Sequence, residues 1–111
     1  MFESFKSIFF LLLLEQVLKH KMEQLSELIR TVQSGNVQKR EESLLELRKR
    51  TKDSEDISLL HRLKFGDVLF ELLEEWKTKY QVVVLSILAN CTNLNEQWRE
   101  FVSFPISYFT F

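Results

Sequence analysis

The hydrophobic residues of the first half of this chain recur at spacings of three and four, the period of a helix that buries one face. From about Phe5 to Val32, the apolar run Ile8 to Leu14 passes into such a stripe, and we expect one long helix. Ser34-Gly35-Asn36 interrupts the pattern, because Gly and Asn accept the backbone that ends a helix. A second helix is expected from Val37 to Thr51, where charges of both signs surround a few leucines.

Three helices are expected between Ile57 and Cys91. They run from Ile57 to about Phe65, from Val68 to about Trp76 and from Tyr80 to Cys91. Gly66-Asp67 should end the first of them and cap the second. The third carries apolar residues on nearly every face, which predicts that protein surrounds it.

Polar residues mark the end of that apolar helix. The run Thr92-Asn93-Leu94-Asn95 predicts a stop and a new cap, since short polar side chains bond the free backbone groups at helix ends. A short helix should begin at Glu96, and Pro105 should stop any helix in the aromatic-rich tail. The chain has only two Gly and one Pro in 111 residues, so we expect an all-α fold.

These patterns divide the chain into three segments. Residues 1–24 form an apolar and then amphipathic N-terminal helix segment, residues 25–102 a helical repeat region, and residues 103–111 an aromatic-rich tail. A length of 111 residues suits one domain with a single modest core.

Composition and charge exclude several classes of function. The net charge of −1 gives no field that would attract nucleic acid. The one cysteine, Cys91, cannot form an internal disulfide and fits a reducing compartment, so we expect a cytoplasmic or nuclear protein. His20 and His61 lie on separate predicted helices without metal-ligand spacing. We find no nucleophile motif or phosphate-binding loop and expect neither an enzyme nor a cofactor.

A pattern match within the chain suggests a repeat. The segment VQKREESLLELRKRT aligns with TKYQVVVLSILANCT about 41 residues further on, within the period of armadillo and HEAT arrays. The order short helix, glycine corner, medium helix and long buried helix resembles an armadillo repeat. Leu69-Phe70-Glu71-Leu72-Leu73 is similar to its LVxLL run, and Leu88-Ala89-Asn90-Cys91 is similar to its LSNL ending.

The turn at Ser34-Gly35-Asn36-Val37 is similar to the entry into the first repeat of importin-alpha-like proteins. The resemblance covers about residues 25–102 and implies an armadillo-like superhelix that binds protein partners, related to nucleocytoplasmic transport adaptors. Such repeats hold basic peptides with a Trp and an Asn on the third helix. Here Asn90 stands at the Asn position and Ser86 at the Trp position, so the pair is incomplete.

If the repeats curve as solenoids do, the third helices line a concave surface. We therefore expect a protein-binding site for a peptide or a helix, formed by Gln38, Glu42, Leu45, Lys49, Gln81, Ser86 and Asn90. About three repeats are usually needed for stability, and this chain holds about one and a half. We expect a short, truncated solenoid whose aromatic ends cap it or cause self-association.

A second interpretation belongs to another class of function. The Phe/Leu-rich N-terminus could anchor a helical protein at a membrane interface. Glu3 and Glu15 weaken the attraction to anionic lipid, and the apolar run is far shorter than the roughly 20 residues of a spanning helix. Binding to an extended or helical protein partner is the favoured interpretation.

Overall fold

Six helices make up the chain in a computed structural model that describes the backbone of residues 2–75 and 78–109 and the side chains of residues 6–74 and 80–103. All elements in these ranges are helical, which confirms the all-α prediction. The helices are α1 Phe2–Val32, α2 Val37–Arg50, α3 Ser54–Arg62, α4 Phe65–Glu75, α5 Thr78–Leu94 and α6 Glu96–Phe109.

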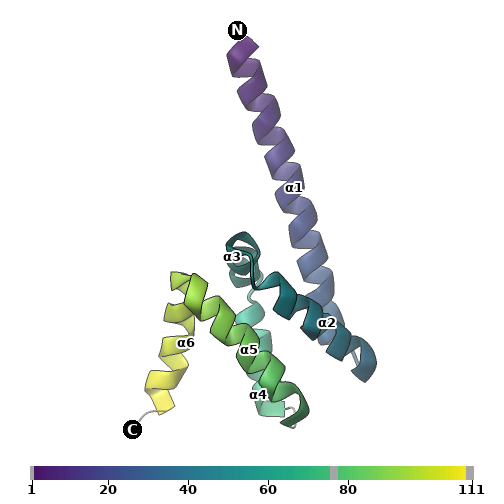
Figure 1. Cartoon of the computed structure of the whole chain (residues 1–111), viewed down its shortest axis with the longest axis vertical. Coiled ribbons are helices and arrows are strands. Elements are labelled where there is room, and N and C mark those ends of the chain that lie inside the picture. Colours follow the sequence, from purple (N-terminus) through teal and green to yellow (C-terminus); the bar gives the residue numbers. More distant parts are fainter. Residues whose placement is uncertain (1, 76–77, 110–111) are drawn as a thin grey trace.

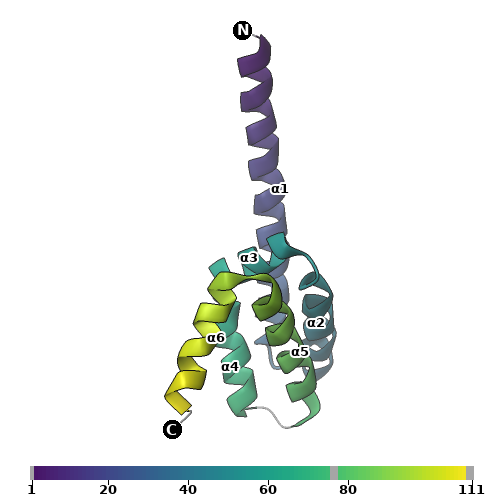
Figure 2. The same ribbon diagram turned by 60° about the vertical axis from the view of Figure 1, so that its left-hand side comes forward.

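The helices form a small body from which α1 projects as a rod, as Figure 1 shows. Only the C-terminal part of α1 packs on the body, against α2 and α3. Helix α5 contacts four other helices, α2, α3, α4 and α6, and so occupies the centre of the body. In Figure 2, α2 and α5 lie side by side and run in the same direction.

Short polar side chains cap α2, α3 and α6. Helix α3 begins at Ser54, earlier than the predicted start at Ile57. Asn36 precedes α2 and accepts a hydrogen bond from the backbone N–H of Lys39 at 3.1 Å. Asp53 precedes α3 and accepts one from Glu55 N–H at 2.8 Å, and Asn95 accepts one from Trp98 N–H at 3.0 Å. Each cap satisfies a donor that the first turn of a helix leaves without a partner.

Trp98 of α6 is the largest side chain in the core and is fully buried. Its indole N–H donates to the carbonyl oxygen of Ile57 in α3 at 2.8 Å. Its ring meets those of His61 and Phe101 edge to face, with centroids 5.9 Å and 6.0 Å away. The apolar ring is thus removed from water while the indole N–H keeps a hydrogen-bond acceptor. Our sequence interpretation did not single out Trp98.

The glycine corner differs from the prediction. The residue that breaks the chain between α3 and α4 is Lys64, which has a φ of 59° in the left-handed region. Gly66 lies inside the first turn of α4, and a Cβ placed there would come within 2.3 Å of the Phe101 ring. Glycine is required at this position by the close approach of an aromatic ring, and the predicted cap at Gly66-Asp67 was wrong.

The predicted helix ends in the last third of the chain were also wrong. Helix α5 continues through Thr92 and Asn93 to Leu94. The Thr92 hydroxyl donates to Leu88 O at 2.9 Å, within the helix, and does not cap a new one. Helix α6 continues through Pro105 to Phe109. Proline removes one backbone donor, but its φ is helical, so a helix can pass through it with one bond fewer. The predicted helix end at Trp76 lies outside the described residues.

The prediction that protein surrounds α5 was wrong as well. Its buried residues, Val84, Ile87, Leu88 and Cys91, all point to one side. On the other side, Val82 is 72% exposed and Leu85 is 54% exposed. An apolar sequence on every face therefore does not mean burial on every face in this chain.

The apolar N-terminal part of α1 is exposed to solvent. Each residue from Ile8 to Leu14 is between 43% and 62% exposed, and Leu18 is the first side chain of the helix that packs on the core. Lys21 then ties α1 to α3 through an ion pair with Glu55 at 2.8 Å. Among the described residues, no helix is long and apolar enough to cross a membrane.

Candidate protein-binding face

Helix α2 presents one stripe of the predicted site. Gln38, Glu42, Leu45 and Lys49 recur at intervals of three and four and therefore share one side of the helix. The opposite side is buried through Ser43, Leu44 and Leu47. Gln38, Glu42 and Lys49 are exposed and Leu45 is half-buried, so the stripe faces solvent.

Asn90 of α5 joins α5 to α2 through a hydrogen bond. Its side-chain N–H donates to the Thr51 hydroxyl oxygen at 3.0 Å, and that hydroxyl donates to the Arg48 carbonyl oxygen at 2.6 Å. Thr51 is buried at the C-terminal cap of α2. The amide that the armadillo resemblance assigns to a peptide therefore also holds α5 against α2.

The structure brings three of the predicted residues together. Lys49, Ser86 and Asn90 line a hollow of about 310 Å³ between α2 and α5, together with Arg48 and Lys52. The predicted residues Gln38, Glu42, Leu45 and Gln81 do not line it. At 100° per residue, Gln81 lies about 140° around α5 from Ser86, on the far flank of the exposed side.

An exposed apolar stripe on α5 borders this hollow. Val82, Leu85 and Ala89 are exposed and lie on one side of the helix, with Ser86 and Asn90 between them and α2. The sequence interpretation missed this stripe because it assigned the whole run to the core. The available signal was the number of apolar residues, since one buried face cannot hold all of them.

The hollow is electropositive. Arg48, Lys49 and Lys52 have no carboxylate within ion-pair distance among the described residues. Arg50, in the same turn, has one, because it pairs with Glu46 at 3.5 Å. The carbonyls at the end of α2 favour cations there, but they leave the full positive charge of the three side chains available to a ligand.

A second hollow, of about 430 Å³, lies where α3 and α4 meet α6. Its rings, Trp98, His61 and Phe101, pack on one another. The indole already donates to Ile57, and the Phe101 ring fills the space over Gly66. These contacts are those of a structural cluster.

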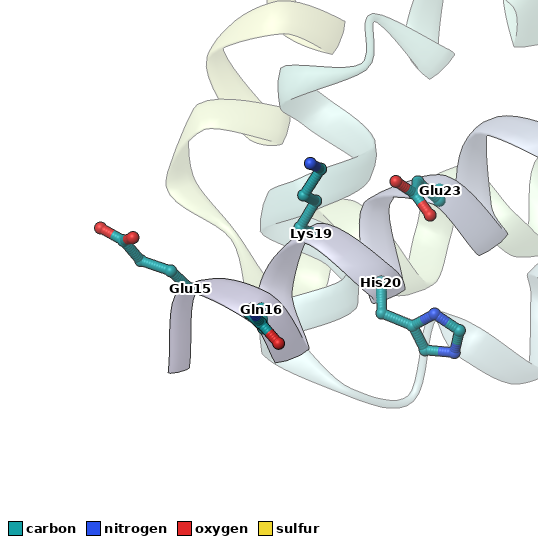
Figure 3. A pocket seen from close by; sticks show the side chains of 5 residues that line it. All are labelled: Glu15, Gln16, Lys19, His20 and Glu23. Atoms are coloured by element: carbon teal, nitrogen blue, oxygen red, sulfur yellow. The ribbon is translucent and has the colours of Figure 1, made fainter. Parts of the chain in front are cut away.

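A third hollow, on α1, is not a site. Its volume of about 620 Å³ is lined by residues of α1 alone, namely Glu15, Gln16, Lys19, His20 and Glu23. Figure 3 shows Lys19 and His20 pointing away from each other on this single helix. Without a second element, no wall encloses a ligand there. The described residues also contain no group of three or more His, Cys, Asp or Glu that could hold a metal ion.

Cys91 is a core residue. Its side chain is fully buried, and burial raises the pKa of the thiol to about 12. A thiol needs a lowered pKa to act as a nucleophile near neutral pH. The environment of Cys91 therefore opposes thiolate chemistry.

Asp56 at the start of α3 is the one buried carboxyl of the described residues. Its Oδ1 has no hydrogen-bond partner there, and burial, followed by repulsion from Asp53, raises the pKa of the carboxyl. A raised acid pKa favours the neutral form in the fold. This group thus contributes stability at acidic pH that is lost as the pH rises through its folded-state pKa.

A comparison of the chain with protein-family models, curated proteins and solved structures finds no match. The function must therefore be argued from the hollow, the apolar stripe and the N-terminal segment themselves.

The bond between Asn90 and Thr51 yields a first prediction. Asn90→Ala and Thr51→Val should each lower the free energy of unfolding by about 1 kcal/mol. The double variant should cost less than the sum by about 0.5–1 kcal/mol, because both changes remove one shared bond. Urea unfolding followed by circular dichroism measures the cycle. Ser86→Ala, in the same hollow, is the control and should change stability by less than about 0.5 kcal/mol. Strict additivity would show that the bond does not couple the helices.

Proposed function

We propose that this chain is a non-enzymatic protein-interaction module whose binding face is formed by α2 and α5. The observation that carries the proposal is the exposed apolar stripe of Val82, Leu85 and Ala89, bordered by a polar hollow on the side of α2. Exposed apolar patches with polar rims are typical of protein-binding surfaces. A peptide or helix of a partner protein would lie along this face.

The helix order supports an armadillo-like arrangement for this module. Helices α3, α4 and α5 follow one another as short, medium and long helices and pack in sequence. Helices α2 and α5, which the internal repeat aligns, lie in parallel beside each other. In a solenoid, equivalent helices stack in this way and form a continuous surface. Such a module would act in the cytoplasm or the nucleus.

Peptide selection on the full-length chain tests this function. Peptides selected from a display library should bind the α5 stripe, and Leu85→Gln should then weaken them about tenfold, because a leucine contact contributes about 1.5 kcal/mol or more. Leu94→Gln is a matched control, since Leu94 is as exposed as Leu85, at 54%, and lies at the end of α5 on another side. Equal binding to both variants, or no selected peptide at all, would refute the proposal.

A second candidate function follows from α1. The seven apolar residues from Ile8 to Leu14 are exposed on all sides of a helix that stands away from the body. Exposed Phe and Leu side chains of a helix can be buried at the headgroup and acyl boundary of a membrane, which would cover the side of this segment that faces the lipid. In this alternative, the segment anchors the chain and the helical body is carried with it.

A further inference from the structure

We propose that the α2/α5 face selects acidic partner segments, with carboxylates in the hollow and apolar side chains on the α5 stripe. The inference rests on the proposed protein-binding function and names the partner's chemistry. Each residue that lines the hollow, namely Arg48, Lys49, Lys52, Ser86 and Asn90, can donate a hydrogen bond, and the set contains no acid.

Three charges of one sign dominate the hollow. Arg48 is half-buried while Lys49 and Lys52 are exposed, so a ligand can reach all three, and none has a carboxylate partner among the described residues. Like charges placed close together are relieved by an anion, and a basic ligand would add repulsion. A carboxylate is therefore favoured here over the basic peptides that the importin-alpha resemblance implies.

The polar donors make the hollow specific for oxygen acceptors. Asn90 has two N–H groups on its amide, and one of them is used by Thr51 at 3.0 Å. Asn90 and Ser86 line the same hollow as the cations. Because the bond to Thr51 fixes the amide, its free N–H is held in place before a ligand binds.

The apolar stripe adds a requirement for apolar residues in the partner segment. Ala89 is next to Asn90 and Leu85 is next to Ser86 in sequence, so stripe and hollow adjoin along more than one turn of α5. A partner with apolar residues beside acidic ones contacts both. The stripe also makes nucleic acid a poor ligand for this face. A phosphate backbone is not stabilised by contact with Val82 and Leu85, and Glu42, on the exposed side of α2, would repel it.

Three labelled peptides test the inference on the full-length chain by fluorescence anisotropy. They share one length and one helical spacing of leucines and carry Glu, Gln or Lys at the other positions. The Glu peptide should bind about tenfold more tightly than the Gln peptide and lose this advantage as the salt concentration rises, and the Lys peptide should bind most weakly. A Glu peptide that does not bind at millimolar concentration, or binds no better than the Gln peptide, would overturn the inference.

Charge-reversal variants test whether the preference for the Glu peptide comes from the hollow. Lys49→Glu with Lys52→Glu should make the Lys peptide bind more tightly than the Glu peptide. The control variant, Lys39→Glu with Arg99→Glu, changes the net charge equally on two exposed residues outside the hollow, and it should keep the order of the unmodified chain. Circular dichroism confirms that both variants fold. The same order in both variants, or tighter binding of a single-stranded oligonucleotide than of the Glu peptide, would overturn the inference.

The two proposals fail in different ways. If all three peptides bind equally and Leu85→Gln weakens them, the face binds protein without selecting acidic segments. If Leu85→Gln has no effect on any ligand, the proposed protein-binding face itself is wrong.

Discussion

Replacing Trp98 by alanine is expected to lower the free energy of unfolding by about 3–5 kcal/mol, the range for removing a buried aromatic side chain. The indole is fully buried and joins α6 to α3 through Ile57. A domain of this size has only about 5–15 kcal/mol of stability to lose. Chemical unfolding followed by circular dichroism should show a much lower midpoint.

Trp98→Phe separates the hydrogen bond from the packing. Phenylalanine keeps most of the apolar volume but removes the bond to the Ile57 carbonyl, which should cost about 0.5–1.5 kcal/mol, since that carbonyl keeps its place in the hydrogen-bonding of α3. Arg99→Ala, at the next residue on the exposed side of α6, is the control and should change stability by less than about 0.5 kcal/mol. If Trp98→Ala costs no more than Arg99→Ala, then α6 does not contribute to the core as the structure indicates.

The helices could be predicted because their signals are local. Asn95 caps the helix that follows it as expected, since a cap depends on residues within one turn. Gly66 shows where such reasoning ends. Its neighbours in sequence suggest a turn, but its role depends on Phe101, which lies on another helix. Lys64 takes the left-handed conformation instead, and lysine gives no local sign of it.

The candidate site could be predicted only in part for a related reason. Lys49, Ser86 and Asn90 meet in one hollow because α2 and α5 pack against each other. The repeat could not show which side of α5 faces solvent. Val82, Leu85, Ile87 and Leu88 are all apolar, so hydrophobicity alone does not tell the buried side from the exposed one. The packing of α2, α3, α4 and α6 against α5 decides it.

Removing four apolar side chains from the N-terminal rod is expected to abolish any association of the chain with neutral lipid vesicles. The variant carries serine at Phe9, Phe10, Leu12 and Leu13, each more than 40% exposed. Full burial of such side chains contributes about 1.5–3 kcal/mol each, so even half of the total lowers partitioning more than about a hundredfold. Flotation with phosphatidylcholine vesicles measures the binding. The melting temperature should stay nearly unchanged, since these residues lie outside the core.

A matched control shows whether the rod itself is responsible. Serine at Val37, Val82, Leu85 and Leu94 removes four apolar side chains of comparable exposure from the body and should leave vesicle binding intact. If the unmodified chain does not float with vesicles, the membrane alternative is wrong. If the control variant alone loses lipid binding, the contact lies on the body, and the α2/α5 face would then bind lipid instead of a protein. Because the two surfaces share no residue, the pair of variants separates the two functions.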